Sequence, residues 1–128
     1  MGELTLRATG PRPADEVWER YADPQRWSSW SPQIRRVDAV GRIRPGLTGR
    51  VASWVPGLAL GFRVLEVDAR RRTWSWAVRS GPLDLVLEHG VAGAGNGRSS
   101  TWLRLRGPSL VLLAYAPLAR MALRRLVH

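Results

Sequence analysis

One stretch of the chain decides the fold that we expect: residues 107–128, which read GPSLVLLAYAPLARMALRRLVH. Gly107-Pro108 marks the start of a helix that continues to near Val127. The first half of this helix, Leu110 to Tyr115, is apolar on nearly all sides. Such a segment is typical of a buried helix. The second half is amphipathic, so we expect the helix to close over a hydrophobic layer.

Before this helix, the sequence alternates with the period of strands and is cut by short turns. The expected strands are Ile34–Val40, Gly49–Val55, Leu58–Val67, Thr73–Arg79, Leu83–Val91 and Ser99–Arg106. The turns include Pro56-Gly57, Gly81-Pro82 and the glycine-rich connection Gly93–Gly97, in which Asn96-Gly97 is a strong hairpin signal. Because short turns join antiparallel neighbours, these strands predict an antiparallel sheet.

The beginning of the chain adds one strand and two short helices. Glu3–Thr9 alternates apolar and polar residues, as a half-buried strand does. A short helix follows Pro13, and a second one begins at Asp23-Pro24 with an N-cap and a proline at the first position. This second helix carries Trp27 and Trp30.

This order of elements predicts an α+β fold with two layers, an antiparallel sheet of about six or seven strands covered by one long helix. A chain of 128 residues suits a single domain over residues 1–128. We see no internal repeat and no linker.

The composition excludes several kinds of site. The chain has no cysteine, which removes disulfides, thiolate metal ligands and cysteine nucleophiles. No apolar run near Met1 resembles a secretory signal. The longest apolar stretch, Leu110–Ala119, is shorter than a membrane span. We therefore expect a cytoplasmic protein with no metal and no cofactor.

The charge is strongly positive, with a net charge of +10 carried by arginine alone. Codon preference explains arginine in place of lysine but not the excess of bases over acids. An arginine-rich module that binds an anionic partner is therefore one functional hypothesis. Its candidate residues are Arg35, Arg36, Arg42, Arg44, Arg70, Arg71, Arg72, Arg104, Arg106, Arg124 and Arg125.

Several short segments, taken in order, carry a resemblance to a known superfamily. They are Ala14–Trp18, Trp27–Pro32, Arg44–Gly49, Val64–Asp68, the pair Trp76 and His89, and Gly95–Gly97 before Thr101-Trp102. In this order the chain resembles the START-like (SRPBCC) superfamily, and within it the small bacterial polyketide cyclase/dehydrase-like, lipid-transport-like proteins.

The resemblance implies a helix-grip fold, in which a curved sheet wraps around the C-terminal helix and encloses a pocket. Members bind lipids, sterols, plant metabolites or polyketide intermediates, and some are enzymes while many are carriers. A fold with so many functions does not name one.

His89 is the one internal histidine, and strand alternation places it with Leu85, Leu87 and Val91 on the apolar face. It could orient a ligand carbonyl or act as an acid or base. The alternative, slightly favoured, is a buried histidine that hydrogen-bonds to a neighbouring element. A single histidine without cysteine does not make an ordinary metal site.

Tyr115 lies on the apolar side of the closing helix, so its hydroxyl either fixes a ligand or bonds to a strand carbonyl. By resemblance, Trp27 and Trp30 lie near the pocket mouth, while Trp74 and Trp76 share one strand face. The predicted ligand-binding residues are Trp27, Trp30, Phe62, Trp76, Leu85, His89, Leu112, Tyr115 and Ala119.

The leading functional hypothesis is a binder or carrier of a hydrophobic small molecule. The alternative is a polyketide cyclase/aromatase or dehydratase, for which His89 and Tyr115 are the catalytic candidates. We expect no specific nucleic-acid partner, a transient contact with anionic membrane, and a monomer or weak homodimer.

Overall fold

Seven strands pair into one antiparallel sheet in the computed structural model, which describes residues 2–53 and 59–128. The strands are β1 (Gly2–Gly10), β2 (Ile34–Asp38), β3 (Thr48–Ser53), β4 (Ala59–Asp68), β5 (Thr73–Ser80), β6 (Leu83–Gly95) and β7 (Arg98–Gly107). The helices are α1 (Ala14–Ala22), a 3₁₀ turn η1 (Pro24–Arg26), α2 (Trp27–Trp30) and α3 (Ser109–Val127).

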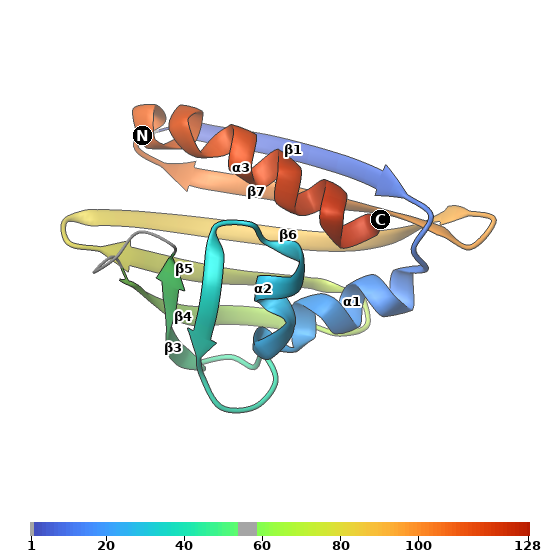
Figure 1. Cartoon of the computed structure of the whole chain (residues 1–128), viewed down its shortest axis with the longest axis horizontal. Helices are drawn as coiled ribbons and strands as arrows, with labels where there is room; N and C mark the ends of the chain where they lie inside the picture. The colour runs from blue at the N-terminus through green and yellow to red at the C-terminus, as the bar shows by residue number, and fades with distance from the viewer. Residues whose placement is uncertain (1, 54–58) are drawn as a thin grey trace.

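The sheet order is β1-β7-β6-β5-β4-β3-β2, so the first and last strands of the chain are neighbours. The segment α1–α2 connects β1 at one edge of the sheet to β2 at the other. α3 lies along β1 and β7, and α1 and α2 lie on the same face of the sheet as α3 (Figure 1). This arrangement confirms the expected helix-grip fold.

Side-chain alternation gives the sheet an apolar inner face beneath the helices. In β5, for example, Trp74, Trp76 and Val78 are buried, while Arg79 is exposed. Bulges interrupt the pairing of β2, β4 and β6. Because a bulge bends its strand and increases its twist, these irregularities help the sheet to curve around the helices.

Most of the expected elements are present, with shifted ends. The 3₁₀ turn and the single turn of α2 replace one continuous second helix, and the side chain of Asp23 accepts a hydrogen bond from the Gln25 N–H, as an N-cap does. The Asn96-Gly97 hairpin is confirmed, since both residues have positive φ values of 53° and 73°. However, Gly93 to Gly95 extend β6 instead of forming a loop.

Three further expectations fall outside the residues that the structure describes. These are the strand end at Val55, the turn Pro56-Gly57 and the strand start at Leu58.

The prediction that the first half of α3 is buried on all sides is wrong. Leu112 and Ala116 face the sheet, whereas Leu110 and Leu113 are exposed. The helix lies over one edge of the sheet only, so its opposite face has no layer above it.

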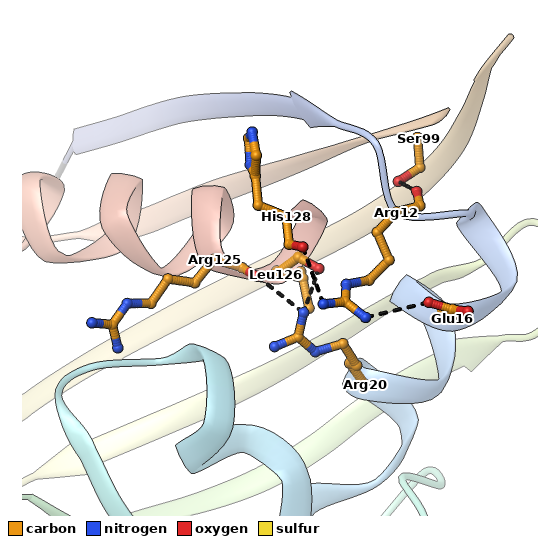
Figure 2. A network of polar contacts seen from close by, with 7 residues as sticks. All are labelled: Arg12, Glu16, Arg20, Ser99, Arg125, Leu126 and His128. Carbon is orange, nitrogen blue, oxygen red and sulfur yellow. Dashed lines mark hydrogen bonds and ion pairs between the residues drawn. The ribbon is translucent and has the colours of Figure 1, made fainter. Parts of the chain in front are cut away.

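Two arginines hold the C-terminal end of α3 (Figure 2). The buried guanidinium of Arg20 donates to the carbonyls of Arg125 and Leu126, at 3.0 and 2.9 Å. Arg12 donates to the His128 carbonyl at 3.1 Å. Cations at this end satisfy the last carbonyls and complement the helix dipole. They fix the helix over the inner face.

Candidate functional site

A cavity of about 410 Å³ lies between the inner face of the sheet and α3. Strands β3 to β7, α2 and the segment 31–34 also line it. α3 contributes Tyr115, Leu118, Ala119, Ala122 and Leu123. Its walls are mainly apolar, and no charged side chain is among the described residues that line it.

The mouth of the cavity lies between α3 and partly exposed residues just before β2 and on β3, β4 and β6. The lining residues that reach solvent are Pro32, Gln33, Ser53, Leu60, Leu85, Tyr115 and Leu118. The resemblance placed Trp27 and Trp30 near the mouth. Both residues line the cavity but are buried, so they form its inner wall instead.

Seven of the nine predicted ligand-binding residues line this cavity. They are Trp27, Trp30, Trp76, Leu85, His89, Tyr115 and Ala119. Phe62 and Leu112 are buried but are not among the described lining residues. Phe62 packs against Trp27 and Trp76 from the core side, which explains the difference. Contact of any of these residues with a ligand stays a prediction.

The inner wall is a cluster of aromatic rings held in fixed orientations. Trp74 stacks on Trp76 with ring centroids 5.5 Å apart and on the His89 ring at 4.7 Å. Trp27 donates its indole N–H to the Tyr21 carbonyl at 2.8 Å, and Trp30 donates to the Arg20 carbonyl at 3.1 Å. Because these indoles are bonded to backbone, the wall keeps its shape without a ligand.

His89 belongs to a chain of buried hydrogen bonds. The indole N–H of Trp76 donates to its Nε2 at 3.0 Å, and its Nδ1 lies 3.3 Å from the Tyr21 hydroxyl. The Tyr21 hydroxyl is 2.6 Å from that of Thr101, which in turn donates to the Gly90 carbonyl at 2.9 Å. Since the indole can only donate, Nε2 accepts and the proton lies on Nδ1.

This buried environment keeps the His89 imidazole and the Tyr21 phenol uncharged. Burial lowers the pKa of His89 to about 3 and raises the pKa of Tyr21 above its ordinary value. Both imidazole nitrogens are engaged by neighbouring elements. The structure therefore agrees with the favoured alternative, a buried histidine bonded to a strand and a helix.

A second polar group lies at the mouth, where Gln33 meets Tyr115. The Gln33 amide donates from Nε2 to the Tyr115 hydroxyl at 2.5 Å, and burial raises the pKa of Tyr115 to about 12. The sequence offered a strand carbonyl as the alternative partner of the Tyr115 hydroxyl, but the partner in the structure is the Gln33 side chain. Within residues 2–53 and 59–128, Gln33 Oε1 and the Trp74 indole N–H are buried without a hydrogen-bond partner. Both residues line the cavity.

Gln33 and Trp74 are absent from the predicted set. Strand alternation puts Trp74 on the same face as Trp76, and this signal was enough to add Trp74 to the predicted ligand-binding residues. No local pattern marks Gln33, because its partner lies 82 residues further along the chain.

No acidic residue lines the cavity among the residues that the structure describes. Asp84 pairs with Arg79, and Glu88 pairs with Arg104 and Arg106. In the part of the chain that the structure describes, no group of three His, Cys, Asp or Glu residues could hold a metal ion.

The arginines named for an anionic partner do not form one free cluster. Six of the eleven make ion pairs, namely Arg36, Arg42, Arg71, Arg72, Arg104 and Arg106. Trp102 lies half-buried over Gly90, with the Arg104 guanidinium 5.8 Å from its ring. Arg42 and Arg72 pair with acidic residues of α1, and the other four arginines pair with acidic residues of the strands.

No helix among the described residues is both long and apolar enough to cross a membrane.

Comparison with known proteins gives one family and many similar folds. The family described as polyketide cyclase / dehydrase and lipid transport matches residues 1–127. A search of curated proteins gives no significant sequence match.

Among solved structures, the Zhui aromatase/cyclase from Streptomyces sp. R1128 is similar with a TM-score of 0.82 and 14% identity, covering 98% of this chain and 91% of that one. The di-domain ARO/CYC BexL has a TM-score of 0.83 at 20% identity, and this chain, covered in full, spans 46% of its length. A major latex-like protein from Panax ginseng has a TM-score of 0.75 at 14% identity, covering 97% and 93% of the two chains. At these identities the likeness shows the fold alone.

Proposed function

The chain belongs to the polyketide cyclase/dehydrase and lipid transport family, and from this premise we propose that it binds and carries an uncharged hydrophobic small molecule. The observation that carries the proposal is the cavity between the inner face of the sheet and α3. Its volume of about 410 Å³ lies in the range of about 300–1,000 Å³ that small-molecule pockets occupy.

The lining supports a ligand that is apolar over most of its surface. Aromatic rings form the inner wall, and aliphatic side chains of α3 form the roof. Burial of apolar surface stabilises a complex by about 25 cal/mol per Å². The rigid aromatic wall favours a ligand with a planar ring system, since flat surfaces stack on it without rearrangement.

The polar groups of the cavity support a ligand with few hydrogen-bonding atoms and no charge. Gln33 Oε1 and the Trp74 indole N–H have no hydrogen-bond partner, but both atoms are buried and expose almost no surface to the cavity. The Tyr115 hydroxyl accepts from Gln33 and keeps its own proton to donate. A charged group would lose its hydration here without gaining an ionic partner.

His89 supports carriage over catalysis. A general base needs a free lone pair near the substrate, but Nε2 already accepts from Trp76. Its pKa of about 3 also makes it a weak base.

A cyclase is the second candidate, favoured by the family and by the polar pair at the mouth. In that case Tyr115 and Gln33 would hold a ketone while the cavity folds a flexible chain, so that shape supplies most of the effect. An added linear polyketone would then be converted to a cyclic product, and Tyr115→Phe would slow this conversion.

Mass spectrometry of solvent extracts from the native protein tests the proposal. Carriage predicts a lipophilic, uncharged compound at a constant ratio to protein, together with saturable fluorescence on addition of N-phenyl-1-naphthylamine, an uncharged aromatic probe. Absence of both a bound compound and a saturable probe signal would overturn it. Conversion of the polyketone would replace carriage with catalysis.

A further inference from the structure

The outer face of α3 is an exposed apolar surface. Leu110, Leu113, Leu118 and Met121 are 82%, 67%, 41% and 47% exposed. Together with Pro117 they follow helical spacing along the side that faces away from the sheet. Large exposed side chains that gather on one face mark an interaction surface more often than scattered ones do.

The same face ends in positive charge. Arg120, Arg124 and Arg125 are exposed, and α3 contains no acidic residue. Within residues 2–53 and 59–128, none of the three makes an ion pair, whereas Arg42, Arg72 and Arg106 elsewhere do. The outer face therefore combines an apolar stripe with unneutralised cations.

The cavity opens beside this face. Leu118 is both exposed and part of the cavity lining, and Tyr115 lies one helical turn before it at the mouth. A surface that covers the outer face of α3 would also cover the mouth.

We propose that α3 docks on the surface of an anionic lipid bilayer through this outer face. The apolar stripe enters the boundary between headgroups and acyl chains, and Arg120, Arg124 and Arg125 contact anionic headgroups. Charge complementarity favours this occupant over a second copy of the chain, which would bring two acid-free cationic faces together. The proposal rests on α3 alone and does not require a ligand in the cavity.

Flotation with lipid vesicles tests the docking. We expect the protein to float with vesicles of phosphatidylcholine and phosphatidylglycerol and not with pure phosphatidylcholine, and binding should weaken as salt is raised. The double variant Leu110→Ser/Leu113→Ser should bind at least about tenfold more weakly, since two exposed leucines leave the apolar stripe. Arg124→Gln/Arg125→Gln should lose about fivefold per arginine.

Matched controls change the same kinds of residue elsewhere. Val40 is 84% exposed but lies outside α3, so Val40→Ser should bind vesicles as the parent does. Arg63→Gln/Arg98→Gln removes the same charge from exposed strand positions and should cost less than twofold. Thermal unfolding and naphthylamine binding verify that each variant keeps its fold and its cavity.

Several results would overturn the docking proposal. They are absence of binding to anionic vesicles at low salt, equal losses in the control variants, and a stable dimer in light scattering that Leu110→Ser/Leu113→Ser dissociates. In the last case a second copy, and not a bilayer, covers α3. Naphthylamine binding that persists in these variants would leave the proposed carriage intact.

Discussion

The hydrogen bonds around His89 leave each participating atom one role. The Trp76 indole donates to Nε2, so Nδ1–H donates to the Tyr21 hydroxyl, which donates to Thr101. The chain ends on the Gly90 carbonyl. A protonated imidazole would bring a second N–H against the indole N–H, and this conflict adds to the cost of burying a charge.

Protonation of His89 therefore opposes folding. Its pKa is about 3 in the folded protein and about 6.5 when unfolded, so the unfolded chain binds more protons between these values. Its contribution to stability is complete above pH 6.5 and is lost as the pH falls toward 3. At pH 4.5 the loss amounts to about 3 kcal/mol.

Urea unfolding of the parent protein and of His89→Gln checks this prediction. The glutamine amide can accept from Trp76 and donate to Tyr21 but does not titrate. From pH 7 to pH 4.5 the free energy of unfolding of the parent should fall by about 3 kcal/mol more than that of His89→Gln. A difference that stays constant would mean that His89 is not buried in its neutral form.

At the scale of elements, α3 illustrates how far a one-dimensional pattern reaches. Its bounds are close to those expected from Gly107-Pro108 and the apolar run that follows. The apolar run from Leu110 to Tyr115 nevertheless led to the wrong prediction that this half of the helix is buried. Such a run indicates that all sides of the helix are apolar, but not how many of them other elements cover. Only one side of α3 meets the sheet, because the helix packs on β1 and β7. These two strands are neighbours at one edge of the sheet, although they are far apart in the chain.

The C-terminal end of α3 depends on Arg20, whose basic side chain is 8% exposed. Burial lowers its pKa to about 10, so it remains charged at neutral pH. Arg20→Met should lower the free energy of unfolding by about 1.5–3 kcal/mol, because two carbonyls lose a charged donor.

Arg26→Met is the matched control for this substitution, since Arg26 is exposed on the neighbouring η1 turn. Denaturant titration should show a change of less than about 0.5 kcal/mol for this control. Equal losses in the two variants would remove Arg20 from the account of how α3 is anchored.

For the whole molecule, period-two alternation was enough to predict the sheet and to place Trp76, His89 and Leu85 on its inner face. The resemblance to the START-like superfamily, carried by the order of short segments, implied where a cavity would lie. The pairing of Gln33 with Tyr115 could not be predicted, because it joins residues far apart in the chain through the curvature of the sheet. Phe62 has the alternation of a lining residue but is covered by two indoles.

The central claim is that the cavity under α3 holds the ligand, and filling the cavity tests it. Ala119 is 1% exposed and lines the cavity, so a phenyl group at this position should enter it. Ala114 lies on the exposed side of the same helix and provides the matched position for an equal change.

Titration of N-phenyl-1-naphthylamine into Ala119→Phe and Ala114→Phe is the most direct measurement. We predict that Ala119→Phe binds the probe at least about tenfold more weakly than the parent, a difference of about 1.4 kcal/mol, with its fold retained. Ala114→Phe should bind as the parent does. Equal affinities for a folded Ala119→Phe and the parent would place the binding site outside the cavity and contradict the account.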